Sequence, residues 1–153
     1  MGLTIGVISD THGLLRPGAV NILKGCDAII HAGDVGSVEI LNELKSLAPT
    51  YAVRGNTDSQ PYARDLPVYD VIHLDEKFIY VTHILENMDL DPKAAGLDIV
   101  VFGHSHTPEI FEKQGVLYIN PGSAGPIRFN RPVSMARIIT GADSAGEIIY
   151  LEK

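Results

Sequence analysis

The amino-acid sequence predicts an α/β fold in which two packed sheets carry helices on their outer faces. Short apolar runs alternate with helical patterns in the first part of the chain, which is typical of a parallel sheet with helical crossovers. Paired apolar runs around short turns dominate the second part, which indicates antiparallel hairpins. The length of 153 residues suits one domain, so we expect a single domain over residues 1–153.

The first part of the chain reads as three strands joined by two helices. Residues 3–8 form an apolar run that predicts the first strand. Residues 17–25 predict a helix, because proline suits its first position and glycine its end. Residues 28–31 and 50–54 predict the second and third strands. Between these strands, residues 37–47 carry apolar side chains three and four positions apart, which predicts an amphipathic helix.

The second part of the chain reads mainly as hairpins. Residues 68–82, 109–119 and 134–151 each contain two apolar runs around a short polar turn. The nearly all-apolar run at residues 98–102 predicts one further buried strand. Together with the first part, this predicts two packed sheets.

Composition and charge exclude several classes of protein. The net charge of −7 argues against a broad basic surface for stable nucleic-acid binding. Cys26 is the only cysteine, so no intramolecular disulfide forms. The start of the chain lacks a signal-peptide pattern, and no apolar run approaches the ~20 residues that span a bilayer. We therefore expect a cytoplasmic protein without a membrane partner. A homo-oligomer is supported only by the general frequency of oligomers among soluble proteins.

Seven side chains that can bind a metal follow the ends of predicted strands, at the edge where open α/β sheets bind ligands. Divalent first-row metals bind imidazole and carboxylate well, and one carboxylate can bridge two ions. A pair of ions about 3.5–4 Å apart clamps a phosphoryl group, and water between the ions loses a proton near neutral pH. The sequence therefore predicts a centre of two divalent cations. The seven residues are Asp10, His12, Asp34, Asn56, His83, His104 and His106.

Each motif has an ordinary structural explanation when it is taken alone. Asp10 and His12 fit a turn or a helix cap. Asp34 fits a strand-to-helix turn, and the segment that begins at Gly55 fits a β-turn. The segment His104-Ser105-His106 is more specific, because two histidines so close together in a loop rarely serve packing. The whole set, each member at a strand end, favours a metal centre.

The two remaining histidines are assigned other roles. His31 lies within the second predicted strand, and we expect a buried, hydrogen-bonded histidine beside the metal ligands. His73 lies within a predicted hairpin strand, and we expect a structural role for it.

With these residues at these positions, the sequence resembles the calcineurin-like metallophosphoesterases, and in particular their small bacterial and archaeal phosphodiesterases. The resemblance extends from Leu3 to about Ile149. The matching segments are Asp10-Thr11-His12, Gly33-Asp34, Gly55-Asn56-Thr57-Asp58, Thr82-His83, Gly103-His104-Ser105-His106-Thr107-Pro108 and Asn120-Pro121-Gly122-Ser123.

The resemblance implies a four-layer α-β-β-α sandwich of two mixed sheets flanked by helices. It implies Mn²⁺ as the most frequent activating ion, with Ni²⁺, Mg²⁺, Zn²⁺ and iron as alternatives. Asp34 would bridge the two ions, and Asn56 would also approach a substrate phosphate oxygen. The catalytic residues would be Asp34, Asn56 and His83. The first ion would be held by Asp10, His12, Asp34 and His106, and the second by Asp34, Asn56, His83 and His104.

This sequence departs from the wider family at three positions. Thr57 stands where many members carry a histidine that protonates the leaving group, and Ser37 stands where many carry the aspartate that orients that histidine. General acid catalysis is typically worth about 10²–10⁴-fold, so we expect slow hydrolysis of alkoxide leaving groups and a preference for phenolate-like ones. Ile84 follows His83, where the family usually has glycine, so we expect an altered loop there or a partly covered cleft.

The leading interpretation is a metal-dependent phosphodiesterase that acts on a small phosphodiester. One alternative is a phosphomonoesterase, and another is a non-catalytic scaffold on the same fold, because a fold alone does not give a function. Arg128 and Arg131 follow the Asn120–Ser123 segment and are candidates for holding a second phosphate substituent or a partner subunit. An ordinary solvated loop is the competing explanation for them.

Overall fold

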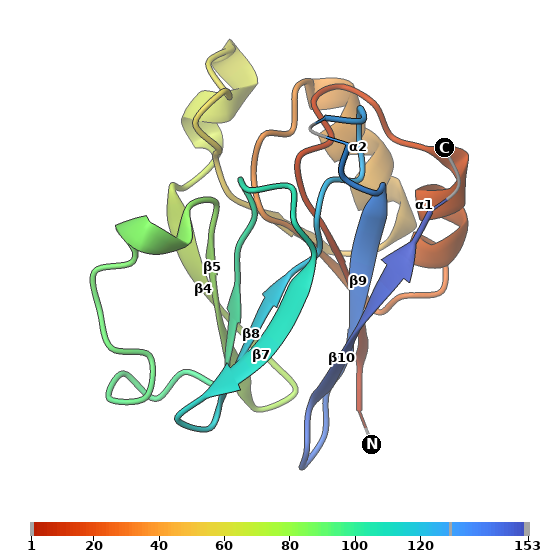
Figure 1. Cartoon of the computed structure of the whole chain (residues 1–153). Helices are drawn as coiled ribbons and strands as arrows, with labels where there is room; N and C mark the ends of the chain where they lie inside the picture. Colours follow the sequence, from red (N-terminus) through yellow and green to blue (C-terminus); the bar gives the residue numbers. More distant parts are fainter. Residues whose placement is uncertain (1, 129, 152–153) are drawn as a thin grey trace.

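The computed structural model describes residues 2–128 and 130–151, and within them two five-stranded sheets pack face to face (Figure 1). In the first sheet β1, β2 and β3 are parallel, whereas β9 runs antiparallel to β1 and β10 antiparallel to β9. The order of strands across this sheet is β10 (Ala145–Tyr150), β9 (Ser134–Ile139), β1 (Thr4–Ile8), β2 (Ala28–His31) and β3 (Thr50–Ala52).

The second sheet is also mixed. Its strands β5, β6 and β8 are parallel, and β4 and β7 pair antiparallel at its two edges. The order across the sheet is β4 (Tyr69–Leu74), β5 (Lys77–Thr82), β6 (Ile99–Val101), β8 (Val116–Asn120) and β7 (Glu109–Lys113). The three hairpins and the buried strand expected from the second part of the sequence are therefore confirmed.

The core between the sheets consists of β-branched side chains from the inner faces of both. Ile5, Val7 and Ile30 from the first sheet pack in one cluster with Ile79 and Val101 from the second, and all five are fully buried. Burial of such side chains stabilises the fold by about 1.5–3 kcal/mol each. This core fixes the two sheets relative to each other.

Two helices cover the outer face of the first sheet. Helix α1 (Pro17–Leu23) begins at a proline, which suits the first helical position, and α2 (Val38–Leu47) follows β2. The inward faces of both helices pack against the far side of the sheet, where Leu23 and Leu44 contact a cluster that includes Ile8 and Ile29. No described helix is both long and apolar enough to cross a membrane.

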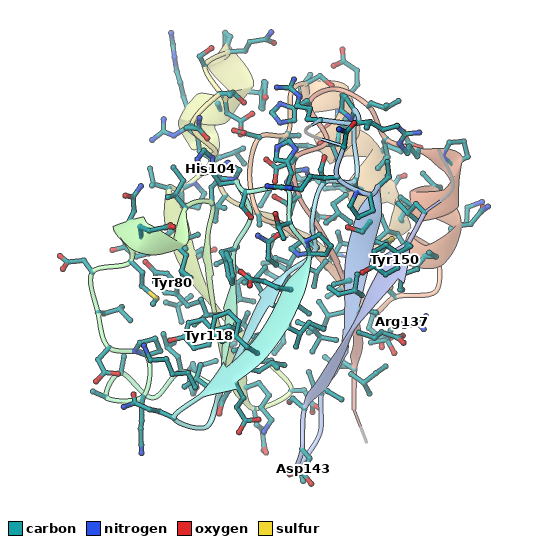
Figure 2. All side chains as sticks on the ribbon, viewed as in Figure 1. Tyr80, His104, Tyr118, Arg137, Asp143 and Tyr150 are labelled. Carbon is teal, nitrogen blue, oxygen red and sulfur yellow. The ribbon has the colours of Figure 1, made fainter. Side chains whose placement is uncertain are left out.

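The outer face of the second sheet has a thinner cover. Residues 83–98 contain only the short 3₁₀ helix η2 (Leu85–Asn87), and Leu85 and Met88 pack on a cluster that includes Tyr80 and Tyr118 (Figure 2). The α/β sandwich of two mixed sheets is confirmed, but in the described residues a loop with one 3₁₀ turn takes the place of an α-helix in the fourth layer. Pro92 and Gly96 lie within this segment, and both residues disfavour the interior of a helix.

The strand directions bring distant segments to one end of the sandwich. Strands β1, β2 and β3 run parallel in one sheet and β5 and β6 in the other, so the loops that follow them gather at the carboxyl ends of the strands (Figure 1). One element there was not expected from the sequence, the 3₁₀ helix η1 (Pro61–Asp65) between β3 and β4.

Candidate metal centre

The loops at the carboxyl ends of the strands carry all seven side chains expected to bind metal. Asp10 and His12 follow β1, and Asp34 follows β2. Asn56 follows β3, His83 follows β5, and a single loop after β6 carries both His104 and His106. Residues up to 96 positions apart in the sequence therefore meet in one place.

Asp10 lies at the middle of this group. Its Oδ1 atom is 3.3 Å from Nε2 of His106 and 3.7 Å from Nε2 of both His12 and His83. Asp34 faces two of the same histidines, with Oδ2 3.1 Å from Nε2 of His83 and 3.7 Å from that of His12. Two carboxylates thus share the histidines that surround them.

These atoms form two overlapping groups with the spacing of metal ligands. Asp10, His12 and His106 make one group, and Asp10, Asp34 and His83 make the other, with ligand atoms within 4.8 Å of one another in each. Asp10 is common to both groups, whereas the resemblance implies Asp34 as the bridge. Asp34 nevertheless faces one histidine of each group.

The buried atoms of these groups fit a bound cation. Asp10 and Asp34 are 0% and 3% exposed, and none of the described residues hydrogen-bonds to Oδ1 of Asp10 or to Nε2 of His12 or His83. A buried polar atom without a partner costs about 1–3 kcal/mol, and buried carboxylates cost more. Several such atoms converging on one point are satisfied together by a divalent cation. The nitrogen and oxygen donors suit first-row divalent metals.

The hydrogen bonds of His83 prepare it for this role. Its Nδ1 atom lies 2.8 Å from the carbonyl oxygen of Ala32, which can only accept a hydrogen bond. Nδ1 therefore carries a proton, and Nε2 points at Asp34. Metal-binding histidines commonly donate one ring N–H to a carbonyl in this way, which sets the tautomer and the ring orientation.

Charge inside the site is strongly coupled. Burial alone would raise the pKa of Asp10, but its contacts with His106, His12 and His83 outweigh burial and hold that pKa far below its ordinary value. Burial would also raise the pKa of Asp34, but His83 and the Thr57 N–H outweigh burial and lower the pKa of that carboxyl group. Burial would lower the pKa of His83, but Asp34 and Asp10 raise it. Both carboxylates are therefore ionised and ready to bind a cation.

The backbone is strained at five of the seven positions. A positive φ angle is uncommon outside glycine and costs roughly 1–3 kcal/mol where it occurs. Backbone hydrogen bonds between neighbouring loops hold these residues in place, including those from Asp10 N to Gly33 O and from His12 N to Asp34 O, each 3.0 Å long. The angles are 57° at Asp10, 45° at His12, 58° at Asp34, 74° at His104 and 61° at His106.

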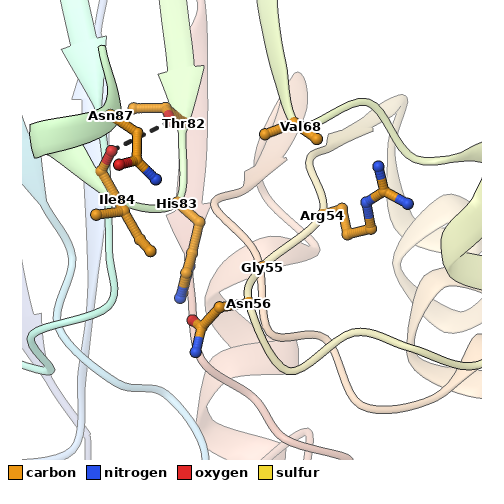
Figure 3. Close-up of a pocket in the computed structure, with 8 residues that line it drawn as sticks. All are labelled: Arg54, Gly55, Asn56, Val68, Thr82, His83, Ile84 and Asn87. Carbon is orange, nitrogen blue, oxygen red and sulfur yellow. Dashed lines mark hydrogen bonds between the residues drawn. The ribbon is translucent and has the colours of Figure 1, made fainter.

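Asn56 and His104 lie at the rim of the centre. Both are exposed, and His104 does not belong to the two groups of converging histidine and carboxylate atoms. The ring of His104 packs edge-on against His83, with centroids 5.2 Å apart, and Figure 3 shows the Asn56 side chain next to that of His83. Five of the six expected histidine and aspartate ligands therefore converge, and His104 and Asn56 flank His83.

A pocket of about 190 Å³ opens beside this rim (Figure 3). Its walls include Asn56 and His83 on the metal side and Val68, Ile84 and Asn87 further out. Ile84 adopts an extended backbone with φ −114°, so it avoids the positive φ that a β-branched residue disfavours. Ile84 lines the pocket, while His83 stays in contact with Asp34.

Asp58 is a central residue to which sequence reasoning gave no role. Its buried carboxylate accepts hydrogen bonds from the backbone N–H of Asp34 (2.9 Å), Val35 (3.0 Å) and Gly55 (2.9 Å), and from the Tyr62 hydroxyl (2.8 Å). It thereby joins the loop after β2 to the loop after β3. Its place in the Gly55-Asn56-Thr57-Asp58 motif was a signal of importance, but a β-turn explains an aspartate equally well at the level of sequence.

The other two histidines behave differently from the ligands. His31 is fully buried, and its Nδ1 accepts a 3.1 Å hydrogen bond from the Gly33 N–H while its Nε2 lies 2.9 Å from the Thr11 hydroxyl. Burial lowers the pKa of His31 to about 4, so the ring is neutral near pH 7. His73 stacks on Phe78 outside the site. The expected roles of both agree with these contacts.

Comparisons with known proteins agree with this geometry. Residues 3–143 match the family model of the calcineurin-like phosphoesterase superfamily domain. A probable metallophosphoesterase of Methanocaldococcus jannaschii is 41% identical over 132 residues, covering 79% of this chain and 68% of that protein. A phosphodiesterase of the same organism is 29% identical over 138 residues, covering 78% of this chain and 83% of that protein.

The fold agrees with the family as well. The solved structure of an archaeal phosphodiesterase superposes with a TM-score of 0.83 at 24% identity, covering 97% of this chain and all of that one. The matched region includes every residue of the candidate centre. The chain therefore belongs to the calcineurin-like phosphoesterase superfamily.

Proposed function

We propose that this protein is a phosphodiesterase that depends on two divalent cations and hydrolyses phosphodiester bonds. The observation that carries the proposal is the position of Asp10 Oδ1, which is buried, lacks a hydrogen bond within the described chain and lies within 3.7 Å of three histidine nitrogens. A structural role would leave this atom paired with a hydrogen-bond donor. A cation between these groups accounts for all of them together.

The proposed ligands follow from the two overlapping groups and their rim. Mn²⁺ is the proposed ion because the resemblance to this family implies it, and the imidazole nitrogens with carboxylate or amide oxygens are compatible with that ion. The first ion would be held by Asp10, His12, Asp34 and His106, and the second by Asp34, Asn56, His83 and His104.

When bound, such ions activate water and stabilise the charge that develops on the reacting phosphate. The chain contributes the positions of the groups around them. The Ala32 carbonyl holds the His83 ring in orientation, and the buried carboxylate of Asp34 faces it. The exposed side chain of Asn56 beside His83 is placed to donate its amide N–H to a phosphate oxygen. Asp34, Asn56 and His83 are accordingly the proposed catalytic residues.

The similarity to a phosphodiesterase at 29% identity over most of both chains favours diesters over monoesters. Thr57, an exposed residue next to Asn56, bears on the leaving group instead, because its side chain cannot protonate one near neutral pH. Substrates with an acidic alcohol as leaving group suit such a site, because they leave without help from an acid.

The test is an assay of metal-stripped protein on a phosphodiester and a phosphomonoester that share one chromogenic leaving group, with each divalent cation added back. We expect diester hydrolysis that returns with Mn²⁺ and disappears in Asp34→Ala. Asp143→Ala at the opposite end of the sandwich is the matched control and should keep full activity (Figure 2). Faster cleavage of the monoester would make the protein a phosphomonoesterase. Bound cations without turnover of either ester would favour a scaffold.

A further inference from the structure

The loop between β8 and β9 is fastened to the ligand loop after β1. The Ser123 hydroxyl donates to the carbonyl of Asp10 at 3.1 Å, and the Ala124 N–H donates to the carbonyl of Ser9 at 3.0 Å. The Arg16 guanidinium donates twice to the Gly125 carbonyl, at 3.2 and 3.1 Å. A side chain at position 125 would come within 2.2 Å of a backbone oxygen of the ligand loop, so only glycine fits. The loop therefore has a defined position beside the metal ligands.

This loop presents Arg131 at the edge of the centre. Nε of Arg131 donates a hydrogen bond of 3.3 Å to the carbonyl of Ser105, the residue between the ligands His104 and His106. The two terminal nitrogens of Arg131 make no hydrogen bond or ion pair with any described residue, and the side chain is exposed. The guanidinium is thus held at one corner, and its outer N–H groups remain available. Such a fork matches the geometry of phosphate oxygens.

Arginine and lysine are separated along the fold. The described lysines lie at the ends of helices, at the turns on the opposite end of the sandwich, or in the loop over the second sheet, at positions 24, 45, 77, 93 and 113. Five of the six arginines lie instead in segments at the metal end, namely Arg16, Arg54, Arg64, Arg128 and Arg131. Arginine is the residue that binds phosphate in two-pronged fashion, so this separation points to phosphate recognition around the centre.

The reacting phosphate does not require these charges. The carboxylates of Asp10 and Asp34, together with a hydroxide and a singly charged diester, would balance the charge of two divalent cations. The charge of Arg131 is additional to that balance. It is therefore suited to a further anionic group on the same substrate.

We infer that the substrate is a phosphodiester that carries a second phosphate group, and that Arg131 binds this second phosphate. The inference rests on the proposed function and narrows its substrate class. The pocket beside Asn56 is small, about 190 Å³ against roughly 300–1,000 Å³ for sites that enclose a whole ligand. It suits one ester substituent, and Arg131, which does not line this pocket and is bound to the loop between His104 and His106, suits a charged group on the rest of the molecule.

Equilibrium binding tests the inference without turnover. Titration calorimetry would compare thymidine 3′,5′-bisphosphate with thymidine 5′-phosphate, each added to Mn²⁺-loaded protein. We expect the dissociation constant of the bisphosphate to be lower by about tenfold or more, because a charge-assisted hydrogen bond contributes binding free energy of that size. Arg131→Gln should lose this preference and Arg131→Lys should keep part of it. Lys113→Gln removes the same charge from an exposed position at the far end and should change nothing. An unchanged preference in Arg131→Gln would overturn the inference.

Hydrolysis separates the inference from the proposed function. The p-nitrophenyl ester of thymidine 5′-phosphate, with and without a 3′-phosphate, gives two diesters with one leaving group. We expect a lower KM with the 3′-phosphate and a similar kcat, and Arg131→Gln should remove the difference in KM. Equal KM values for both diesters would overturn the inference and leave the phosphodiesterase intact. Preferential binding of the bisphosphate without turnover of either diester would overturn the proposed function and the diester substrate with it, and would leave only the binding of a second phosphate by Arg131.

Discussion

The carboxylate of Asp58 accepts the backbone N–H of Asp34 at 2.9 Å, and the same oxygen accepts the N–H of Gly55 at 2.9 Å. One buried side chain thus holds the loop of Asp34, a proposed metal ligand whose φ angle is 58°, and the loop that carries Asn56. An aspartate keeps a left-handed backbone conformation only where neighbouring groups stabilise it. The hydrogen bonds of Asp58 stabilise this conformation at Asp34.

Asp58→Asn should weaken metal binding and destabilise the protein. Both oxygens of Asp58 accept hydrogen bonds, so an amide NH₂ group at either position would face an N–H or O–H donor. We expect a loss of about 1–3 kcal/mol in the free energy of unfolding and about 10–100-fold in affinity for the cations. Thermal melting and Mn²⁺ titration measure these two effects. Asp65→Asn, an exposed aspartate in η1, is the control, and equal behaviour of the two variants would contradict the role given to Asp58.

Gly55→Ala should displace Asp34, whereas the same substitution at Gly18 should not. A Cβ atom at position 55 would lie 2.1 Å from Oδ1 of Asp34 and 2.3 Å from its backbone nitrogen, so Asp34 must move. We expect weaker binding of both Mn²⁺ ions, because Asp34 is proposed to bind both, and calorimetric titration measures this. Gly18→Ala in α1 meets only Leu151 Cδ2 at 3.8 Å, and it should leave metal binding intact and stabilise the helix by about 0.5–1 kcal/mol. Unchanged affinity for both ions in Gly55→Ala would refute this account.

The metal-free protein should lose stability as pH rises above neutrality. The pKa of His83 is raised from its ordinary value of 6.5, because Asp34 and Asp10 outweigh the effect of burial. Its protonation therefore stabilises the fold fully below pH 6.5, and this contribution is lost as pH rises through the raised pKa. A bound cation replaces the proton, so Mn²⁺ should remove the alkaline decline. Urea unfolding between pH 6.5 and 8.5, with and without Mn²⁺, measures it. The same decline in His83→Ala would assign the effect to another group.

His31 should account for a loss of stability on the acid side. Burial lowers the pKa of its ring from 6.5 to about 4, so the unfolded chain takes up this proton more readily than the folded one. The contribution of the neutral ring is present above pH 6.5 and falls by about 3 kcal/mol on approach to pH 4. Urea unfolding of the metal-free protein should show this slope. His31→Asn should flatten it, because the Asn oxygen can still accept the Gly33 N–H.

His73→Asn provides the matched control for that experiment. His73 stacks on Phe78 and is exposed, so its substitution should leave the acid slope unchanged. If His31→Asn retained the full slope between pH 6.5 and 4, His31 would not be its source. The carboxylates of the centre cannot account for a slope in that range, because their stabilising effect falls only as pH drops below their ordinary value of 3.8.

The gathering of the candidate ligands at one edge was predictable from the sequence for a simple physical reason. A short, largely apolar run such as residues 28–31, bounded by turn-forming residues, favours a buried strand, and a polar residue three positions later then lies at its end. Parallel strands place all such ends together. Asp34 and His83 could thus be placed at one edge without knowledge of any contact between them. The same reasoning found the hairpins, whose turns are marked by local chemistry.

The backbone conformation of the ligands and the role of Asp58 could not be predicted in this way. A positive φ at His104 or Asp10 is imposed by hydrogen bonds between loops, and no local preference of either residue signals it. Asp58 acts through the backbone of a segment 24 residues away. The short 3₁₀ helix η1 was missed because it lies among turn-forming residues and has no apolar periodicity over a helical length.

The shared carboxylates have a consequence for how the centre would fill. Asp10 belongs to both groups of converging atoms and Asp34 is proposed to bind both ions, so one cation cannot bind without altering the site of the other. Occupancy of the two positions is then thermodynamically linked, and by reciprocity each ion changes the affinity for its neighbour by the same factor. The chain would pass between empty and doubly loaded forms with a poorly populated intermediate if that factor favours binding. The concentration of free cation would then act on this protein as a threshold.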